Sequence, residues 1–563
     1  MNLLSTVYVL VIMVITLIAA TERDKTTMDF INRVITKIFS NPSVGNTDSS
    51  KEPEEAKALL TTNLQENIQH INNSLGNSSD IVIREIQIGS QRQIKAAIIF
   101  TDGLADSKSI QNFIMESLML NVANTDPDKL VTSQEDIFQV LKDHFLTAGS
   151  VKDVSEWGPI LTSLLSGDAI LLLEGYAKGF SIGMRGWKDR AVSETTTETV
   201  IRGPKEGFTE NLRTNTALIR RKIKDPNLWL ETKEIGRVTK TDVAIMYIKG
   251  IVSDDILEEV HKRLDRIDID GILESGYIEE LIEDETYTPF PTIYHSERPD
   301  VIAADLLEGK VAILVDGTPI VLVVPTMLAS FVQAAEDYYQ RADISTLIRV
   351  LRYVCIFISL LGPSLYIAIT TFHQEMLPTQ LLISLASQRE GVPFPAFIEA
   401  LMMELSFEIL REASLRLPKA IAQSISIVGT LVIGSAAVAA GIISAAMVIV
   451  VAITAISSFV LPAYDMAMTI RMLRFLMMGL AASFGLFGII IGIIAIVLHL
   501  CSLRSFGIPY MSPFAPYLRD DMKDTIFRMP RWAMFTRPRL SNQKNIIREQ
   551  STPPEKPRNN TGG

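Results

Sequence analysis

The longest apolar stretch of the chain covers residues 421–462 and contains no Asp, Glu, Lys or Arg. A helix that crosses a bilayer needs roughly 20 mostly apolar residues, so this stretch is long enough to cross twice. We expect the reversal near Gly441 to Ser444. Gly, Ala and Ser are frequent here, and such small side chains let helices pack closely in lipid, where burial alone does not hold them together. The pattern therefore predicts two tightly packed membrane helices.

Two other apolar segments, residues 348–371 and 475–500, predict one membrane helix each. Arg349 and Arg352 at the start of the first segment are expected to extend to the interface, and Gly362-Pro363 to kink the helix. Between the first and second crossings, residues 380–387 are too short to cross and residues 394–417 form an amphipathic, charged helix. The pattern predicts four crossings, with one additional spanning or re-entrant element left open in that interval.

The N-terminal region, residues 1–57, contains a hydrophobic run and a polar segment. The run over residues 2–20 lacks the Lys/Arg-rich start of a secretory signal. A signal anchor, an additional span and a start-site artefact with Met28 as the initiator all remain open. One additional crossing would change the side on which the following residues lie. Residues 21–57 are polar and rich in turn formers, which predicts a flexible linker.

Residues 58–296 predict a soluble region of the α/β or α+β class, because strand-like and helix-like segments alternate. We assign residues 58–190 to a first subdomain and residues 191–296 to a second. The predicted strands cover residues 81–88, 96–100, 169–173, 179–184 and 242–248, and the predicted helices cover residues 59–75, 107–120, 254–267 and 278–281. Asp106, at the end of the sequence DGLAD, is the expected N-cap of the helix that follows.

Residues 297–347 are interpreted as a juxtamembrane connector. Asp316-Gly317 separates two β-branched runs, which is a hairpin signal. We predict a hairpin docked against an all-α polytopic membrane domain of residues 348–500, with a short span as the alternative.

The tail, residues 501–563, carries eleven Lys/Arg and five Asp/Glu, a net charge of +6, and its last part is predicted to be disordered. Basic flanks favour the cytoplasmic side, so four crossings place the soluble half on that side too. Arg471 and Arg474 would then flank an outer loop, which conflicts mildly with this orientation.

The composition argues against several classes of protein. A formal net charge of −11 disfavours a nucleic-acid partner. The two cysteines, Cys355 and Cys501, and the six scattered histidines form no disulfide framework and no metal-binding motif. No arrangement of nucleophile and base is recognisable. The sequence therefore predicts neither an enzyme nor a bound cofactor or metal.

An acidic repeat marks the amphipathic helix. Glu404, Glu408 and Glu412 are spaced four residues apart and share one helix face, with Arg416 one turn further. In a symmetric ring of subunits they would form stacked carboxylate rings, which concentrate and pass cations. The alternative is a solvated face with a Glu412–Arg416 pair.

A polar face on the segment of residues 348–371 is a second candidate ion path. Ser359, Pro363, Tyr366 and Thr370 lie at helical spacing, so they could line a pore with the proline kink as its gate. The alternative is hydrogen bonding to a neighbouring helix.

Residues 202–221, the charged segment, are predicted to form a loop in which Gly203-Pro204 and Gly207 force turns, and the segment is not a P-loop. Because arginine favours bidentate pairing with carboxylates, we expect a salt-bridge network at a subunit or subdomain seam, with an anion site as the alternative. The candidate residues are Arg202, Glu206, Glu210, Arg213, Arg220 and Arg221.

Several long blocks resemble the A subunit of the GerA-type spore germination receptors over residues 80–516. They are DGLAD at residues 102–106, VIRGPKEGFTENLRTNTALIRRKIKDP at residues 200–226, PFP and ERPD within residues 289–300, LLEGKVAILVDGTP at residues 306–319, EDYY at residues 336–339, and EILREASLRLP at residues 408–418. Two departures are Thr195, where the family usually has proline, and the N-terminal hydrophobic run.

The resemblance implies a multi-pass protein of the spore inner membrane that takes part in nutrient-triggered germination. It implies a transporter-like B subunit and a lipoprotein C subunit as partners. It also implies a homo-oligomer that forms a nutrient-gated channel for monovalent cations. A membrane-anchored scaffold or transducer without its own pore is the alternative, and a solute transporter is disfavoured because no internal repeat is visible.

Overall fold

The computed structural model describes residues 58–88, 94–115, 138, 150–186, 195, 198–418, 434–538 and 545–549. The N-terminal hydrophobic run, its linker, the first part of the central apolar stretch and the end of the tail lie outside these ranges. Contacts divide the chain into one unit of residues 1–59 with 156–158 and a second unit of all other residues. The elements below belong to the second unit, apart from the first two residues of α7.

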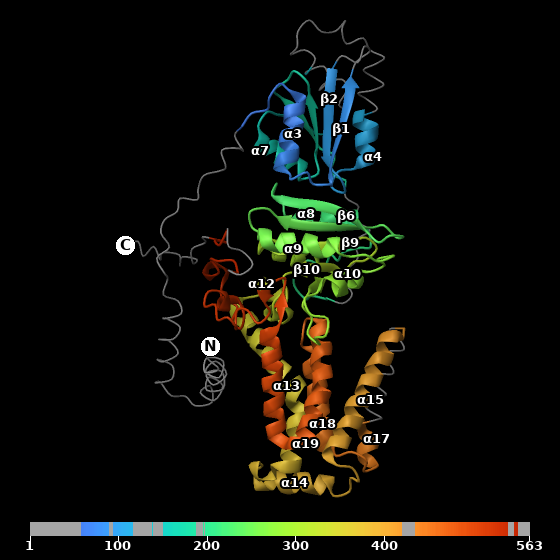
Figure 1. Ribbon diagram of the computed structural model, residues 1–563, viewed down its shortest axis with the longest axis vertical. Helices are drawn as coiled ribbons and strands as arrows, with labels where there is room; N and C mark the ends of the chain where they lie inside the picture. Colours follow the sequence, from blue (N-terminus) through green and yellow to red (C-terminus); the bar gives the residue numbers. More distant parts are fainter. Residues whose placement is uncertain are drawn as a thin grey trace, which may run out of the picture. The chain divides into compact units, whose positions relative to one another are not determined.

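The first soluble subdomain contains an antiparallel sheet with strand order β1-β2-β4-β5-β3 (Figure 1). Its strands are β1 (Ile81–Ile88), β2 (Ile94–Thr101), β3 (Val151–Val154), β4 (Ala169–Leu173) and β5 (Gly179–Ile182), and its helices are α3 (Leu64–Ser74), α4 (Ser107–Ser109), the π-helix η2 (Ile110–Met115) and α7 (Trp157–Leu164). The inner strand β4 reads AILLL and is buried at every position. Such continuous burial is what its uninterrupted apolar sequence predicts.

The predicted strands of this subdomain are confirmed, and so is the helix cap at Asp106. The Asp106 carboxylate accepts a hydrogen bond from the backbone N–H of Lys108 at 3.1 Å and from the hydroxyl of Ser109 at 2.7 Å. The Ser109 hydroxyl lowers the pKa of Asp106 below its ordinary value. The predicted helix over residues 107–120 is described only to Met115, where it continues α4 as a π-helix.

The second sheet is also antiparallel, with strand order β6-β7-β9-β10-β8. Its strands are β6 (Leu228–Ile235), β7 (Thr241–Ile248), β8 (Tyr294–Ser296), β9 (Val311–Val315) and β10 (Val321–Val324), and its helices are α8 (Leu212–Lys222), α9 (Asp254–Asp265), α10 (Ser275–Ile282) and α11 (Pro299–Leu307). Val243 and Ile245 pack with α9 and α10 on one face, whereas Ala244 and Met246 pack with α8 and α11 on the other. Helices therefore cover both faces of this sheet.

The predicted hairpin exists, but its expected position was wrong. The strands on either side of Asp316-Gly317 are β9 and β10, which pair with each other and with β7 and β8. The hairpin is thus part of the second sheet rather than a connector docked on the membrane domain. Its side chains are apolar because helices cover both faces of that sheet, not because the segment faces lipid.

The charged segment of residues 202–221 was expected to be a loop, and its second half is not. Residues 212–222 form α8, which begins after Asn211, whose side chain accepts a hydrogen bond from the backbone N–H of Thr214 at 3.0 Å. Such an N-cap satisfies a backbone donor that the first turn leaves free. Gly203 and Gly207 indicate turns in the first half of the segment only, and Asn211 is the local signal for the helix that forms the second half.

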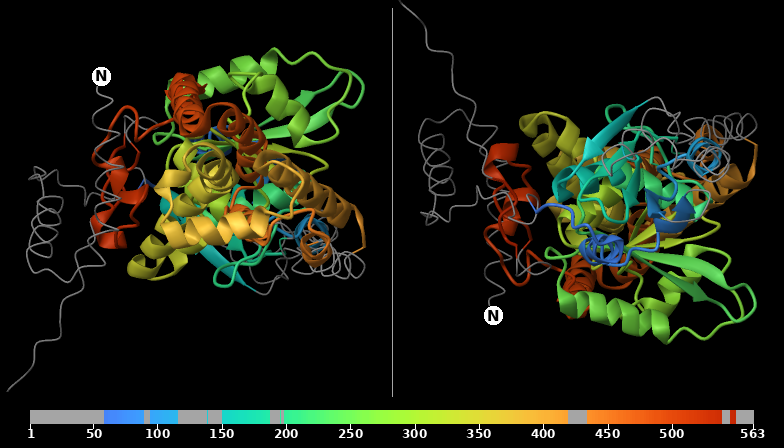
Figure 2. Two further views of the ribbon diagram at one scale, coloured as in Figure 1. Left: turned by 90° about the horizontal axis from the view of Figure 1, so that it is seen from below. Right: turned by 90° about the horizontal axis from the view of Figure 1, so that it is seen from above.

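The chain after β10 is mostly helical (Figures 1 and 2). Its elements are η7 (Leu328–Phe331), α12 (Glu336–Tyr339), α13 (Ala342–Phe372), η8 (Gln374–Met376), α14 (Thr379–Arg389), α15 (Ala396–Arg416), α17 (Gly434–Ala439), α18 (Ala445–Phe459), α19 (Tyr464–Ser502), β11 (Arg504–Ser505), β12 (Ile508–Pro509), η10 (Asp521–Asp524) and η11 (Arg531–Ala533). Among the described helices, α13 and α19 are long and apolar enough to cross a bilayer, and α18 is a shorter apolar helix. Residues 440–444 separate α17 from α18, at the position of the predicted reversal.

The prediction of one straight helix at residues 475–500 was wrong, because α19 folds back on itself. Gly485 has φ 60° and ψ −140°, a backbone conformation outside the helical region. Beyond it the two arms pack closely, since a Cβ built on Gly488 would lie 2.2 Å from the carbonyl oxygen of Leu480 and one on Gly492 would lie 2.5 Å from the sulfur of Met477. In a straight helix, residues 477 and 492 would be roughly 22 Å apart.

The two ends of α19 approach the same soluble loop. The hydroxyl of Thr469 donates a hydrogen bond to the carbonyl oxygen of Pro289, and Nε2 of His499 lies 2.9 Å from the hydroxyl oxygen of Thr288. The fold-back therefore returns the chain to the second sheet before the tail begins. The start of α19, where an outer loop flanked by Arg471 and Arg474 was expected before the last crossing, thus contacts the soluble region instead.

Replacement of Gly485 by alanine is expected to destabilise the α19 fold-back by about 1–3 kcal/mol, the usual strain of a side chain in a glycine-only backbone region. The new Cβ would also lie 2.8 Å from the ring of His373. Thermal unfolding of the full chain in nanodiscs measures the loss. Gly479→Ala is the matched control, because no atom lies within 4 Å of its added Cβ. Equal stability of the two variants would contradict the fold-back.

Candidate functional site

A buried ion pair joins three apolar helices. Nη1 of Arg474 on α19 lies 2.5 Å from the Glu404 carboxylate on α15, and both side chains are almost fully buried. The same guanidinium donates from Nε to the backbone carbonyl of Ser359 on α13 at 2.7 Å, and from Nη2 to the Ser359 hydroxyl at 3.0 Å. The structure thus brings together two candidate ion-path residues that lie far apart in sequence. We refer to Ser359, Glu404 and Arg474 as the buried charge cluster.

The other two members of the acidic repeat also pair with arginine. Glu408 lies 2.9 Å from Nη1 of Arg471, whose side chain is buried. Glu412 lies 2.7 Å from Arg416 on an exposed surface of α15, as the alternative interpretation expected. The three carboxylates therefore differ in environment, although they share one face of one helix. In this conformation each has a cationic partner from its own chain.

Sequence reasoning missed a fourth carboxylate, Glu399 in the first turn of α15. It is fully buried, accepts hydrogen bonds from the backbone N–H of Ser444 at 3.1 Å and from its hydroxyl at 2.9 Å, and lies 3.3 Å from Nε of Arg389. These contacts join the end of α14, the start of α15 and the start of α18. Glu399 lies outside the four-residue repeat, so spacing gave no signal for it.

The polar face of α13 is packed against neighbouring helices. Ser359 and Pro363 are buried, and the Thr370 hydroxyl donates to the backbone carbonyl of Tyr366 at 2.7 Å. A Cβ built on Gly362 would lie 2.8 Å from the Thr454 hydroxyl oxygen, so α13 and α18 are in close contact here. The approach of Gly362 to Thr454 fits the interpretation that small residues join helices, whereas the Thr370 hydrogen bond stays within α13.

The expectation that Arg349 and Arg352 extend to a membrane interface was wrong. Both side chains are buried and pair with the Asp337 carboxylate, at 3.2 and 2.7 Å, and Arg349 also lies 2.9 Å from Asp524 in the tail. The buried carboxylates provide the partners that water would otherwise supply. These residues join the start of α13 to α12 and to the tail.

Two of the six candidate residues in the charged segment form ion pairs with residues of the first subdomain. Arg220 on α8 forms a fully buried bidentate pair with Asp80, which precedes β1, at 2.5 and 2.8 Å. Its third contact is to the carbonyl oxygen of Leu228 at 2.8 Å. Arg213 lies 3.7 Å from Asp102 in the DGLAD turn, and both are partly exposed. These pairs connect the second subdomain to the first.

The remaining seam candidates act within the second subdomain or toward the helical part. Arg221 lies 3.6 Å from Glu206. The backbone carbonyl of Glu210 accepts a hydrogen bond from the N–H of Gly317 at 2.8 Å. The backbone N–H of Arg202 donates to Glu336 on α12 at 3.4 Å. These three contacts therefore lie within the second subdomain or between that subdomain and α12.

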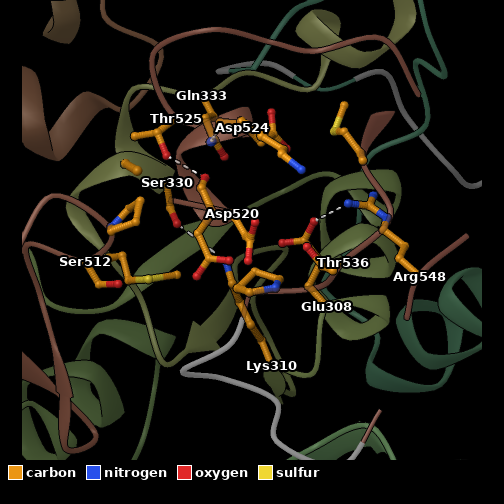
Figure 3. Close-up of a pocket in the computed structure, with 17 residues that line it drawn as sticks. Glu308, Lys310, Ser330, Gln333, Ser512, Asp520, Asp524, Thr525, Thr536 and Arg548 are labelled. Atoms are coloured by element: carbon orange, nitrogen blue, oxygen red, sulfur yellow. Dashed lines mark hydrogen bonds and ion pairs between the residues drawn. The ribbon is translucent and has the colours of Figure 1, made fainter. Parts of the chain in front are cut away.

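A cavity of about 80 Å³ lies where the tail packs on the second sheet and η7 (Figure 3). Charged groups of both signs line it, among them Glu308, Lys310 and Arg548. Arg548 lies 3.1 Å from Glu308, and Lys310 lies 2.6 Å from Asp305. Because these charges compensate one another, we assign the lining a structural role.

Glu198, which precedes the charged segment, is a buried carboxyl of the soluble region whose pKa is shifted toward neutrality. Burial raises its pKa from the ordinary 4.5 to about 7, against the hydrogen bond from the Ser296 hydroxyl, which lowers it. The neighbouring carboxylate of Glu297 also raises it.

We expect this group to make the soluble region less stable as the pH rises from about 4.5 to about 7. The folded state holds the proton over that range and the unfolded state releases it, so the contribution is greatest below the unfolded pKa. Unfolding of the full chain as a function of pH measures the slope. Glu198→Gln keeps an acceptor for Ser296 and should make the slope shallower, leaving the part that Glu283 contributes through its own raised pKa of about 7. An unchanged slope in this variant would contradict the assignment.

The chain is similar to several known proteins. A relative from Bacillus subtilis (strain 168), "Spore germination protein KA", is 49% identical over 499 residues, covering 89% of this chain and 90% of its own length. "Spore germination protein GerLA" of Bacillus cereus is 39% identical over 486 residues, covering 86% of this chain and 97% of its own. The crystal structure of the N-terminal domain of the A subunit of the Bacillus megaterium spore germinant receptor GerK3 shares 44% identity, covering 48% of this chain and 98% of that one, with a TM-score of 0.39.

Among the described residues, two antiparallel sheets are followed by two helices that are long and apolar enough to cross a bilayer, and together with the germination relatives these helices suggest a membrane protein. The family model described as "Bacillus/Clostridium GerA spore germination protein" matches residues 69–540. The chain belongs to this family, as the sequence blocks indicated. Its relatives are spore germination proteins, so the chain has a role in germination.

Proposed function

We propose that this chain is the A subunit of a nutrient germinant receptor in the spore inner membrane. It acts there with a transporter-like B subunit and a lipoprotein C subunit, and several copies form a path for monovalent cations. Family membership and the apolar helices α13 and α19 support the placement in a membrane receptor. The homo-oligomer, the partners and the path are the proposal.

The observation that carries the ion path is the buried charge cluster. Burying a carboxylate and a guanidinium among apolar helices costs free energy, and charged residues at such positions usually have a functional role. Helices that only anchor a soluble domain need no such pair. We assign Glu404, Glu408 and Glu412 to the path, with Ser359, Pro363 and Tyr366 on the facing helix α13. In the described conformation Arg474 compensates Glu404, so we infer that nutrient binding separates this pair and frees the carboxylate for cations.

Potassium flux from liposomes containing the chain with its B and C partners tests this assignment. Glu404→Gln should reduce nutrient-triggered flux to the level of liposomes without the chain, because the cation site is gone while Arg474 keeps its charge. Arg474→Gln should give flux without nutrient. Arg416→Gln changes only an exposed pair and serves as the control. Unaltered flux in both cluster variants, with correctly folded protein, would eliminate the buried charge cluster from the path.

The alternative is a transducer without its own pore. It is favoured by the network in which Arg349 joins α13, α12 and the tail, because this network would transmit movement between the helices and the soluble region. Cross-linking in native membranes separates the two proposals. A ladder of homo-oligomers supports a shared path, whereas one copy per complex leaves only the transducer.

A further inference from the structure

Three metal-ligating side chains meet where the second sheet contacts the start of α19. They are Glu279 from α10, His295 from the edge strand β8 and Asp465 from the first turn of α19. Nδ1 of His295 lies 3.6 Å from Oε2 of Glu279 and 3.4 Å from Oδ2 of Asp465. That nitrogen is buried and makes no hydrogen bond to any described residue. All three ligand atoms lie within 4.8 Å of one another.

We propose that Glu279, His295 and Asp465 bind one divalent first-row metal ion of the Zn²⁺ type. Bonds from zinc to histidine nitrogen and carboxylate oxygen measure roughly 2.0–2.2 Å, so neighbouring ligands of a tetrahedral site lie about 3.4 Å apart. The observed separations of 3.4 and 3.6 Å match this spacing. Three protein ligands leave a fourth position for water.

The ligand set selects the kind of ion. Imidazole nitrogen suits zinc and its neighbours, whereas calcium and magnesium prefer oxygen alone. The surroundings of the site are also acidic. Burial, and then the neighbouring carboxylates of Glu279, Glu280 and Glu285, raise the pKa of Glu283 to about 7. Such a surface attracts cations toward the site.

The same three residues have a metal-free state with which the ion competes. In the metal-free arrangement Nδ1 of His295 lies between the two carboxylates, at 3.6 and 3.4 Å. Metal ligands must be deprotonated, so uptake of the ion releases protons and strengthens as the pH rises. In either state the group joins the soluble region to α19, and the ion makes that connection stronger.

The experiment measures metal directly and needs no germination assay. Full-length chain carrying a histidine-free affinity tag is purified in nanodiscs, stripped with a chelator, exposed to Zn²⁺ alone and desalted. We expect one equivalent of zinc by elemental analysis, visible d–d absorption after replacement by Co²⁺, and proton release on binding. His295→Asn and Asp465→Asn should lose all three signals. If either fails to fold, Glu279→Gln, on the surface helix α10, should weaken zinc binding by at least tenfold.

The matched control is His261→Asn. Nε2 of His261 lies 3.4 Å from Glu231, so it faces one carboxylate at a similar distance, and among the described residues it belongs to no three-ligand group. This variant should keep the full equivalent of zinc. Two results would overturn the proposal: wild-type protein that retains no more zinc than His295→Asn, or loss of zinc in His261→Asn as well. The first result would mean that the three residues only form ion pairs with one another and do not bind metal.

Discussion

Replacement of Arg474 by methionine is expected to lower the free energy of unfolding by about 3–5 kcal/mol, the usual cost of leaving a buried charge without its partner. The variant keeps the volume of the side chain but strands the Glu404 carboxylate among apolar helices. It also removes two hydrogen bonds to Ser359 on α13. Unfolding of the full chain in nanodiscs, followed by circular dichroism, measures the loss.

A second substitution separates lost charge pairing from lost packing. Combining Arg474→Met with Glu404→Met removes both charges, and we expect it to recover most of the stability, because buried pairs contribute little beyond a well-packed apolar replacement. Arg416→Met breaks the exposed pair with Glu412 on the same helix and should cost less than about 1 kcal/mol. Equal losses for Arg474→Met and Arg416→Met would show that the buried charge cluster is not buried in the membrane-embedded protein.

Replacement of Arg220 by methionine is expected to be similarly costly, by about 3–5 kcal/mol, and to uncouple the two soluble subdomains. Arg220 and Asp80 are fully buried and form a bidentate pair between α8 and the strand β1 region, so the variant leaves an unpaired carboxylate at the seam. Hydrogen exchange should increase on both sides of the seam, and unfolding should separate into two steps.

The chain offers a close control for this variant. Arg221 lies next in sequence but faces Glu206 at 3.6 Å with partial exposure, so Arg221→Met should cost less than about 1 kcal/mol and leave the exchange pattern unchanged. A single cooperative transition and unchanged exchange in Arg220→Met would mean that the two sheets are held together by other contacts.

Local sequence signals predicted the regular elements well where one physical rule governed them. Continuous apolar runs, such as all of β4 and Val243 to Ile248 of β7, became strands, because an uninterrupted apolar run is a signal carried by neighbouring residues. The cap at Asp106 followed from a side chain and the N–H groups beside it. The α8 start at Asn211 was overlooked, although its signal was equally local.

Elements that depend on distant partners were placed less well. The apolar strands β9 and β10 carry the same composition as a membrane-docked hairpin, and only their pairing with β7 and β8 shows that they belong to the sheet. The apolar length of α19 is compatible with one straight helix. Its fold-back at Gly485 depends on whether the arm with Gly488 and Gly492 packs against the arm with Met477 and Leu480, which composition does not express.

The same distinction between local pattern and distant partners applies to the candidate site. The spacing of Glu404, Glu408 and Glu412 was visible in the sequence, but their different environments were not. Whether a carboxylate is buried depends on the arginine opposite it, and Arg474 is 70 residues away from Glu404 along the chain.

By itself, then, the sequence determined the family, the two soluble subdomains, the apolar segments and the positions of the charged residues, because these depend on composition and short-range pattern. Only the tertiary structure decided which charges pair, where the last apolar segment turns back, and that Glu279, His295 and Asp465 meet. The physical reason is that pairing energies depend on distance in space, and chain separation carries almost no information about that distance once the protein has folded.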